Sequence, residues 1–246
     1  MKILVIGDSC KDVHVYGVSE RLCPDAPVPI FVPIFEKINK GMAGNVYANL
    51  LSLGVECDLI TNEKEITKTR YVEEKTNYII IRVDSGEEKI DRVVGLEKIN
   101  FSTYDAVVIS DYNKGFLTID DILFISQHHS MIFIDTKKAL GDWVKNIKFI
   151  KINEIERRRS NHYLGVNPLR EQLITTVGSK GCEYREELYP VEKVEIKDLS
   201  GAGDSFLSAL VYKFLKTKNM DESLKFANTC ATKVVQQKGV TLINDI

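Results

Sequence analysis

The stretch Asp198-Leu199-Ser200-Gly201-Ala202-Gly203-Asp204-Ser205-Phe206 decides the fold of this chain. A turn of small residues leads directly into the amphipathic segment 204–216, which predicts a loop followed by a helix. Free N–H groups at a helix start form an anion site, and glycines let a phosphate approach the backbone. Because like charges repel, Asp204 is a poor ligand for the phosphate itself. Its carboxylate is suited instead to accept a proton from a hydroxyl that attacks the phosphate. The alternative is an ordinary aspartate cap after a glycine turn.

Short apolar runs elsewhere predict the buried strands of a parallel sheet. They lie at residues 3–6, 106–109, 131–134, 147–152 and 173–177. Several of these runs are followed by a polar residue or a glycine, namely Asp8, Asp111, Asp135, Asn153 and Gly178. We therefore expect the carboxyl ends of the strands to carry the site. Helices are predicted at residues 45–53, 204–216 and 221–238, the first and last of them followed by a glycine.

Two further regions break this alternation of strands and helices. Residues 28–35, 77–83 and 89–94 have the pattern of strands, and only the turn signal of residues 84–87 separates the last two. A small antiparallel sheet, set apart from the main one, would explain them. Such a sheet could cover the site as a lid.

The composition excludes several other classes of protein. A net charge of -2 over 246 residues gives no positive field to attract nucleic acid. No apolar run is long enough to span a membrane, and the first residues lack a signal-peptide pattern. The five cysteines are scattered without a C-x-x-C pair, which is typical of the reducing cytoplasm. We therefore expect a cytoplasmic protein whose partners are small molecules, not nucleic acid or a membrane.

The glycine turn and several other stretches resemble the signatures of one family. Gly201-Ala202-Gly203-Asp204 resembles the D-T-x-G-A-G-D signature of the ribokinase-like, or PfkB, carbohydrate kinases. Residues 41–45 (G-M-A-G-N) resemble the family's G-G-x-x-N, residues 153–156 its N-x-x-E, and residues 176–181 its T-x-G-x-x-G. Finer matches at residues 24–29 (P-D-A-P-V-P), 67–70 (T-K-T-R), 110–115 (S-D-Y-N-K-G) and 134–137 (I-D-T-K) resemble the branch that phosphorylates heptose 7-phosphate.

The resemblance implies a three-layer α/β domain with a mostly parallel central sheet and a small β-sheet lid. It implies one domain over residues 1–246, with lid segments at about 13–35 and 70–94. It also implies ATP and Mg²⁺ as cofactors, and a homodimer formed through the lid. The apolar residues 30–32 and 79–81 favour such a dimer, because a small sheet cannot bury both of its faces.

The resemblance also assigns a role to each candidate site residue. Asp204 would be the catalytic base, and the anion hole would consist of Gly201, Ala202 and Gly203. Substrate contacts would come from Asp8, Asp12, Gly41, Asn45, Arg70, Arg82, Asp111 and Lys114, with the three basic residues holding a substrate phosphate. The ATP side would consist of Lys137, Asn153, Thr176, Gly178, Gly181 and Asn228. Asn153 and Glu156 would hold Mg²⁺ through water. The alternative for Glu156 is a surface carboxylate, and for Asp12 a turn residue.

Two departures from the family pattern leave other functions open. Met42 replaces the second glycine of the first signature, and the interval from Gly54 to Lys68 is about two dozen residues shorter than usual. The alternatives are a kinase for another sugar or sugar phosphate, and a pruned sugar-binding relative without turnover.

Overall fold

The main sheet of the protein is mostly parallel and has eight strands. The computed structural model describes residues 1–245, without the side chains of residues 89 and 245. The strand order is β12-β11-β10-β9-β8-β7-β1-β4, and the pairs from β4 to β10 are parallel while β11 and β12 are antiparallel. The strands are β1 (Lys2–Gly7), β4 (Glu56–Ile60), β7 (Ala106–Asp111), β8 (Ile132–Thr136), β9 (Phe149–Asn153), β10 (Leu173–Thr176), β11 (Cys182–Tyr184) and β12 (Glu187–Tyr189).

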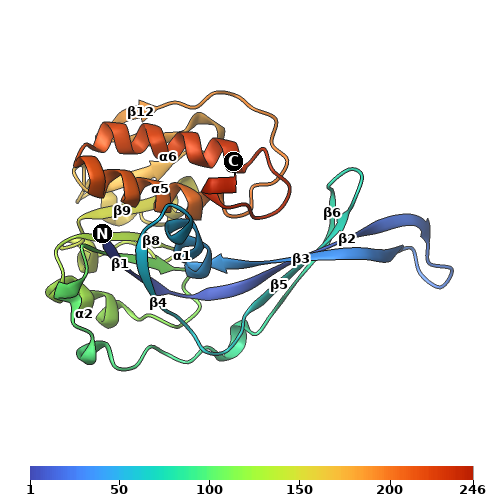
Figure 1. Ribbon diagram of the computed structural model, residues 1–246, viewed down its shortest axis with the longest axis horizontal. Helices are drawn as coiled ribbons and strands as arrows, with labels where there is room; N and C mark the ends of the chain where they lie inside the picture. Colours follow the sequence, from blue (N-terminus) through green and yellow to red (C-terminus); the bar gives the residue numbers. More distant parts are fainter. Residues whose placement is uncertain (246) are drawn as a thin grey trace.

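Helices cover both faces of this sheet, which gives three layers (Figure 1). On one face lie α1 (Ala43–Ser52), α5 (Ala202–Thr217) and α6 (Met220–Val234); on the other lie α2 (Ile119–His128), α3 (Glu154–Arg159) and α4 (Asn161–Leu164). Side chains of β1 alternate between the two cores, with Ile3 and Val5 in one and Leu4 and Ile6 in the other. A strand covered on both sides must be apolar throughout, which is why the predicted runs are continuous.

A second, smaller sheet has the order β3-β2-β5-β6. It consists of β2 (Ser9–Leu22), β3 (Pro29–Met42), β5 (Thr67–Glu73) and β6 (Ile79–Ser85). The long hairpin of β2 and β3 projects far from the main body (Figure 1). The cross-strand register places Asn39, Asp12, Lys68 and Asp84 in one row on the face that carries the buried side chains of β2.

The structure confirms the five predicted strands of the main sheet and the three predicted helices, and corrects three details. The small sheet is mixed, because β2 pairs with β5 in parallel. Residues 89–94 do not form a strand: Val93 donates its N–H to the carbonyl of Phe116 and packs in the core, so this segment is a pinned loop. The last helix ends at Val234, because the carbonyl of Val235 accepts the N–H of Lys197.

Short connections complete the chain. Single 3₁₀ turns occur at Glu87–Lys89, Leu96–Lys98, Phe101–Thr103, Asp142–Val144, Gly178–Lys180 and Ile243–Asp245. The chain passes from β4 to β5 through residues 61–66 without a helix or strand. Of the helices in the described part of the chain, none is long and apolar enough to cross a membrane.

Candidate active site

Asp204 lies in the first turn of α5, where the main domain meets the small sheet. Its side chain is almost fully buried, with 4% of the residue exposed. Asn45 of α1 donates a hydrogen bond from Nδ2 to Oδ2 at 3.0 Å, and the hydroxyl of Tyr112 donates to Oδ1 at 2.8 Å. No cation pairs with this carboxylate among the described residues. It therefore has neutral partners and a buried charge.

Burial raises the pKa of Asp204 to about 6, although the hydrogen bonds from Asn45 and Tyr112 act in the opposite direction. Such a carboxyl is ionised at neutral pH and is more basic than an exposed aspartate. The pKa of Tyr112 is raised well above its usual value by burial and by the nearby charge of Asp204. Tyr112 therefore stays protonated and donates. These are the properties of a general base that accepts a proton near pH 7.

Two backbone amides at the start of α5 have no acceptor among the described residues. Gly201 precedes the helix with φ +79°, and a Cβ there would lie 2.7 Å from Nδ2 of Asn45. The N–H of Ala202 bonds to Leu199, whereas those of Gly203 and Asp204 have no acceptor among the described residues. The two free amides and the helix dipole make this position suited to an anion.

Lys151 adds a positive charge at the same place, and the sequence reasoning missed it. A Cβ on Gly203 would lie 3.0 Å from Nζ of Lys151, which is buried on β9. Lys151 donates to Oδ2 of Asp135 at 2.6 Å, and Lys137 lies 3.7 Å from Oδ1 of the same carboxylate. These two lysines hold the pKa of Asp135 below its usual range despite its burial. The only available signal was a charged residue inside an apolar strand run.

Asn153 and Glu156 form a capping box at the start of α3. Oδ1 of Asn153 accepts the N–H groups of Ile155 and Glu156, and Oε2 of Glu156 accepts the N–H of Asn153 at 2.7 Å. Oε1 accepts from Asn153 Nδ2 and from Lys137. Glu156 is buried, so the surface-carboxylate alternative is wrong. With three donors on about four acceptor positions, this carboxylate has one acceptor position left.

Two of the predicted substrate ligands accept hydrogen bonds from protein groups. Asp8 accepts the N–H groups of Tyr112 and Phe116 and so holds the loop after β7. Burial, with the nearby Asp111, raises the pKa of Asp8. Asp111 accepts from Thr136 at 2.5 Å and from Lys138 at 2.6 Å. Both aspartates position the loop that carries Tyr112.

Asp12, Gly41 and Asn45 line the junction with the small sheet. Nδ2 of Asn45 touches Asp204 itself. Asp12 forms a buried ion pair with Arg70 at 2.5 Å. Gly41 faces Asp12 and Cys10 across the β2–β3 pair, and any side chain there would overlap them. This packing gives a physical reason for glycine at the first position of the signature.

All three predicted phosphate ligands are paired with carboxylates. Besides the pair of Arg70 and Asp12, Arg82 binds Asp84 through two hydrogen bonds of 2.7 Å, and Lys114 binds Glu87 at 2.5 Å. Arg70 and Arg82 are register partners on β5 and β6. The structure brings these residues together around the small sheet but leaves no positive charge unmatched in any of the three pairs.

The residues predicted for the adenosine side lie at the antiparallel end of the sheet. Thr176 ends β10, and Gly178 begins the 3₁₀ turn that leads to Gly181. Nδ2 of Asn228 donates to the carbonyl of Tyr189 at 2.8 Å, and Gly181 approaches that same carbonyl. Asn228 interrupts the apolar face of α6 in order to fix β12.

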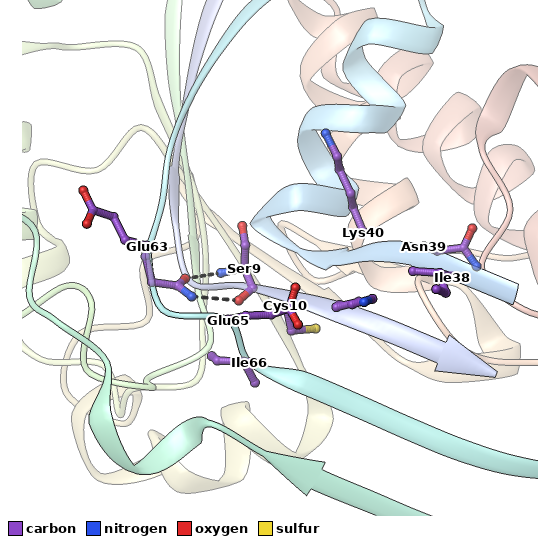
Figure 2. A pocket seen from close by; sticks show the side chains of 10 residues that line it. Ser9, Cys10, Ile38, Asn39, Lys40, Glu63, Glu65 and Ile66 are labelled. Carbon is purple, nitrogen blue, oxygen red and sulfur yellow. Dashed lines mark hydrogen bonds between the residues drawn. The ribbon is translucent and has the colours of Figure 1, made fainter. Parts of the chain in front are cut away.

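Met42 and the shortened segment lie beside a pocket on the other side of β2. Met42 has φ 58° and ψ −132°, a conformation that favours glycine, and its side chain is buried with Cys10 and Ile66. The pocket has a volume of about 370 Å³ and contains none of the predicted site residues. Ser9 and Asn62, which both line it, are joined by two hydrogen bonds, drawn at Ser9 in Figure 2. Its floor is formed in part by residues 62–66, where the chain is short.

The parallel sheet, the helix start with free amides and the small second sheet define a ribokinase-like fold. Residues 130–246 match the model of the pfkB family carbohydrate kinases. The chain is 29% identical over 286 aligned positions to the bifunctional protein HldE of Nitratiruptor, covering 97% of this chain and 62% of that protein. Over residues 130–246 the chain is therefore similar to the PfkB family of carbohydrate kinases, and it spans less than two thirds of the curated relatives it matches.

Solved structures agree on the fold. A ribokinase from Thermotoga maritima has a TM-score of 0.71 at 18% identity, covering 97% of this chain and 94% of that one. The Arabidopsis thaliana ribokinase complexed with ribose and ATP has a TM-score of 0.68 at 14% identity, covering 99% and 95%. The alignment with the Nitratiruptor protein is longer than the 246 residues of this chain, so that relative has segments that this chain lacks.

Proposed function

We propose that this protein is an ATP-dependent sugar kinase that phosphorylates heptose 7-phosphate at its anomeric hydroxyl to give heptose 1,7-bisphosphate. The observation that carries the proposal is Asp204, a buried carboxylate with neutral partners beside two free amides. The similarity to a bifunctional HldE protein and the branch-specific stretches, such as residues 110–115, support the choice of heptose.

Each group at the helix start has a distinct part in this reaction. Asp204 accepts the proton of the sugar hydroxyl while the new oxygen–phosphorus bond forms and the bond to ADP breaks. The amides of Gly203 and Asp204 and the ammonium of Lys151 lie where the transferred group would carry negative charge. Asn45 and Tyr112 hold the carboxylate in place and leave it basic.

ATP and Mg²⁺ are the cofactors that we propose. The relative from Arabidopsis binds ATP, and this chain has the corresponding fold. Thr176, Gly178, Gly181 and Asn228 would surround the nucleoside, with Lys137 toward the phosphates. Mg²⁺ would neutralise phosphate charge, and its waters would bind Glu156 and Asn153, since Glu156 has an acceptor position left.

ADP release with a panel of sugars and sugar phosphates tests the proposal. Heptose 7-phosphate should give the highest kcat/KM, and Asp204→Asn should remove that activity. Equal turnover of a free hexose would overturn the substrate assignment. Binding of sugar and ATP without turnover would instead favour the pruned relative, for which the strained Met42 and the short segment 61–66 are the specific observations.

We also propose that the small sheet is a lid on a single domain of residues 1–246. Its segments, about 13–35 and 70–94, touch the loops around the helix start: Nδ2 of Asn77 donates to the carbonyl of Lys197 at 2.6 Å, and Nζ of Lys238 donates to that of Glu74 at 3.1 Å. The scattered cysteines support a reducing compartment such as the cytoplasm.

The outer face of this lid supports a homodimer. The register aligns Ile38, Val13 and Val83 in one row and Val15 and Ile81 in the next, opposite to the face that carries Asp12. Ile38, Val83 and Ile81 are about half exposed. A second copy of this face would cover them.

Light scattering at micromolar concentration tests the dimer. Ile81→Lys, at a residue that is 54% exposed, should yield monomers. Ile155→Lys is the matched control, because Ile155 is 59% exposed on α3 in the main domain. A wild-type monomer, or dissociation by the control alone, would contradict the proposal.

A further inference from the structure

One basic residue at the candidate site has no carboxylate partner. Arg70, Arg82 and Lys114 each form an ion pair, as described above, and so do Lys137, Lys138 and Lys151. Lys68 forms no ion pair or side-chain hydrogen bond with the described side chains, although only 7% of the residue is exposed. Lys68 is therefore the unmatched positive charge of this region.

The cross-strand register explains why Lys68 has no partner. Its neighbours in the row are Asp12 on β2 and Asp84 on β6. Asp12 turns to Arg70 and Asp84 turns to Arg82, so both adjacent carboxylates are occupied. The ammonium of Lys68 lies instead over the ring of Tyr112, 5.4 Å from its centroid.

Tyr112 connects this charge to the proposed base. Its hydroxyl donates to Asp204, while its ring faces Lys68 and, at 5.1 Å, Lys137. Asp204 and Lys68 thus both lie against Tyr112 without an ion-pair partner, Asp204 at its hydroxyl and Lys68 over its ring. A buried ammonium without a counter-ion is costly, and an anion supplied by a ligand would remove that cost.

We propose that Lys68 binds the anionic group, a phosphate monoester, of the sugar substrate. This inference rests on the proposed kinase function and names the residue that would select a phosphorylated sugar. A substrate that extends from the hydroxyl of Tyr112 to the face of its ring presents its own hydroxyl to Asp204 and its phosphate to Lys68. Arg70, Arg82 and Lys114 then keep their carboxylates and shape the row instead of binding the phosphate directly.

Lys68→Met tests the proposal, because methionine keeps most of the apolar stem and removes the charge. Lys11→Met is the matched control: Lys11 is on the same sheet, in the row of Lys40 and Thr67 on the opposite face. Removing an unmatched buried charge should leave the melting temperature of Lys68→Met equal to or above that of the wild type. Loss of binding would then not reflect unfolding.

Kinetics with a sugar phosphate and the matching free sugar give the decisive comparison. Lys68→Met should lower kcat/KM for the phosphorylated sugar by about 10- to 100-fold, with little change for the free sugar or in the KM of ATP. The control should behave as the wild type. An equal loss on both sugars, or a loss confined to ATP, would overturn the proposal.

A binding measurement keeps the test valid if no sugar is turned over. Millimolar inorganic phosphate should raise the melting temperature of the wild type and of Lys11→Met but not that of Lys68→Met. The same increase in all three proteins would refute a phosphate site at Lys68. The absence of turnover would refute the kinase function alone.

Discussion

Asp204→Asn should abolish turnover and at the same time stabilise the protein. The pKa of the folded carboxyl, about 6, lies about two units above the 3.8 of an ordinary aspartate. Each unit corresponds to 1.36 kcal/mol, so ionisation of Asp204 costs the folded state about 3 kcal/mol at neutral pH. The asparagine side chain has no such cost. Its oxygen can accept from Asn45, and its amide can donate to the hydroxyl of Tyr112.

The sign of the pH dependence follows from the direction of this shift. Because the folded pKa is raised, the cost is fully present above pH 6 and disappears as the pH falls toward 4. Thermal unfolding of both proteins at several pH values measures it. At pH 8 the variant should melt roughly 6–12 °C higher, as expected for 3 kcal/mol in a chain of this size, and the gap should close in acid. Turnover should fall by at least about 10²-fold.

The same chemical change at Asp198 is the matched control. Asp198 accepts N–H groups from Ser200 and Gly239, so its charge is satisfied by hydrogen bonds. Asp198→Asn should therefore lower the melting temperature and cost less activity than Asp204→Asn. If Asp204→Asn melts at or below the wild-type temperature at pH 8, burial does not set its pKa. If it retains activity within a few-fold, Asp204 is not the base.

Further predictions concern the groups around the base. The kcat/KM of the wild type should fall as the pH drops through about 6. The hydrogen bond from Tyr112 lowers the pKa of Asp204, so Tyr112→Phe should raise that pKa and move the fall in kcat/KM to higher pH. An unchanged pH profile would exclude this role of Tyr112. Gly201→Ala should cost more stability than Gly54→Ala. Both glycines have a positive φ, so alanine at either position costs about 1–2 kcal/mol of backbone strain, but only a Cβ at residue 201 would contact Asn45. Equal melting temperatures for these two variants would contradict that packing.

The main sheet could be predicted from the sequence, because continuous apolar runs have few other uses in a soluble fold. The small sheet was harder. β2 contains Lys11, Asp12 and His14, and its polar residues are buried against charged partners from β5. Val13 and Val15 alternate with Asp12 and His14, so in β2 a face with polar residues is buried and the hydropathy does not mark it. Residues 89–94 contain Ile90, Val93 and Val94, yet they pack as a loop because Val93 bonds to Phe116 and not to a strand.

Single site residues were predictable where a motif contains them, and their partners were not. The glycine turn identified Asp204 as the candidate base, but nothing in the sequence places Tyr112 on its carboxylate from 92 residues away. Charge pairing depends on cross-strand register, so the sequence does not indicate that Lys68 and Lys151, among all the lysines, lie at the site. The capping box of Asn153 and Glu156 was visible as N-x-x-E, and its structural role accompanies any role in metal binding.

The hairpin of β2 and β3 has two parts with different mechanical properties. Its strands are 14 residues each, or roughly 45 Å long. Register shifts between Tyr16 and Gly17 and between Val18 and Arg21 interrupt the ladder about halfway along. The base carries the row of Asp12, whereas the outer arm touches little else. Bulges of this kind bend the strand and increase its local twist, so the arm continues at a different twist from the base. The proposed dimer face, with Val13 and Ile38 in one row, lies on the base and not on the arm, so substitutions in the arm leave both that face and the row of Asp12 in place.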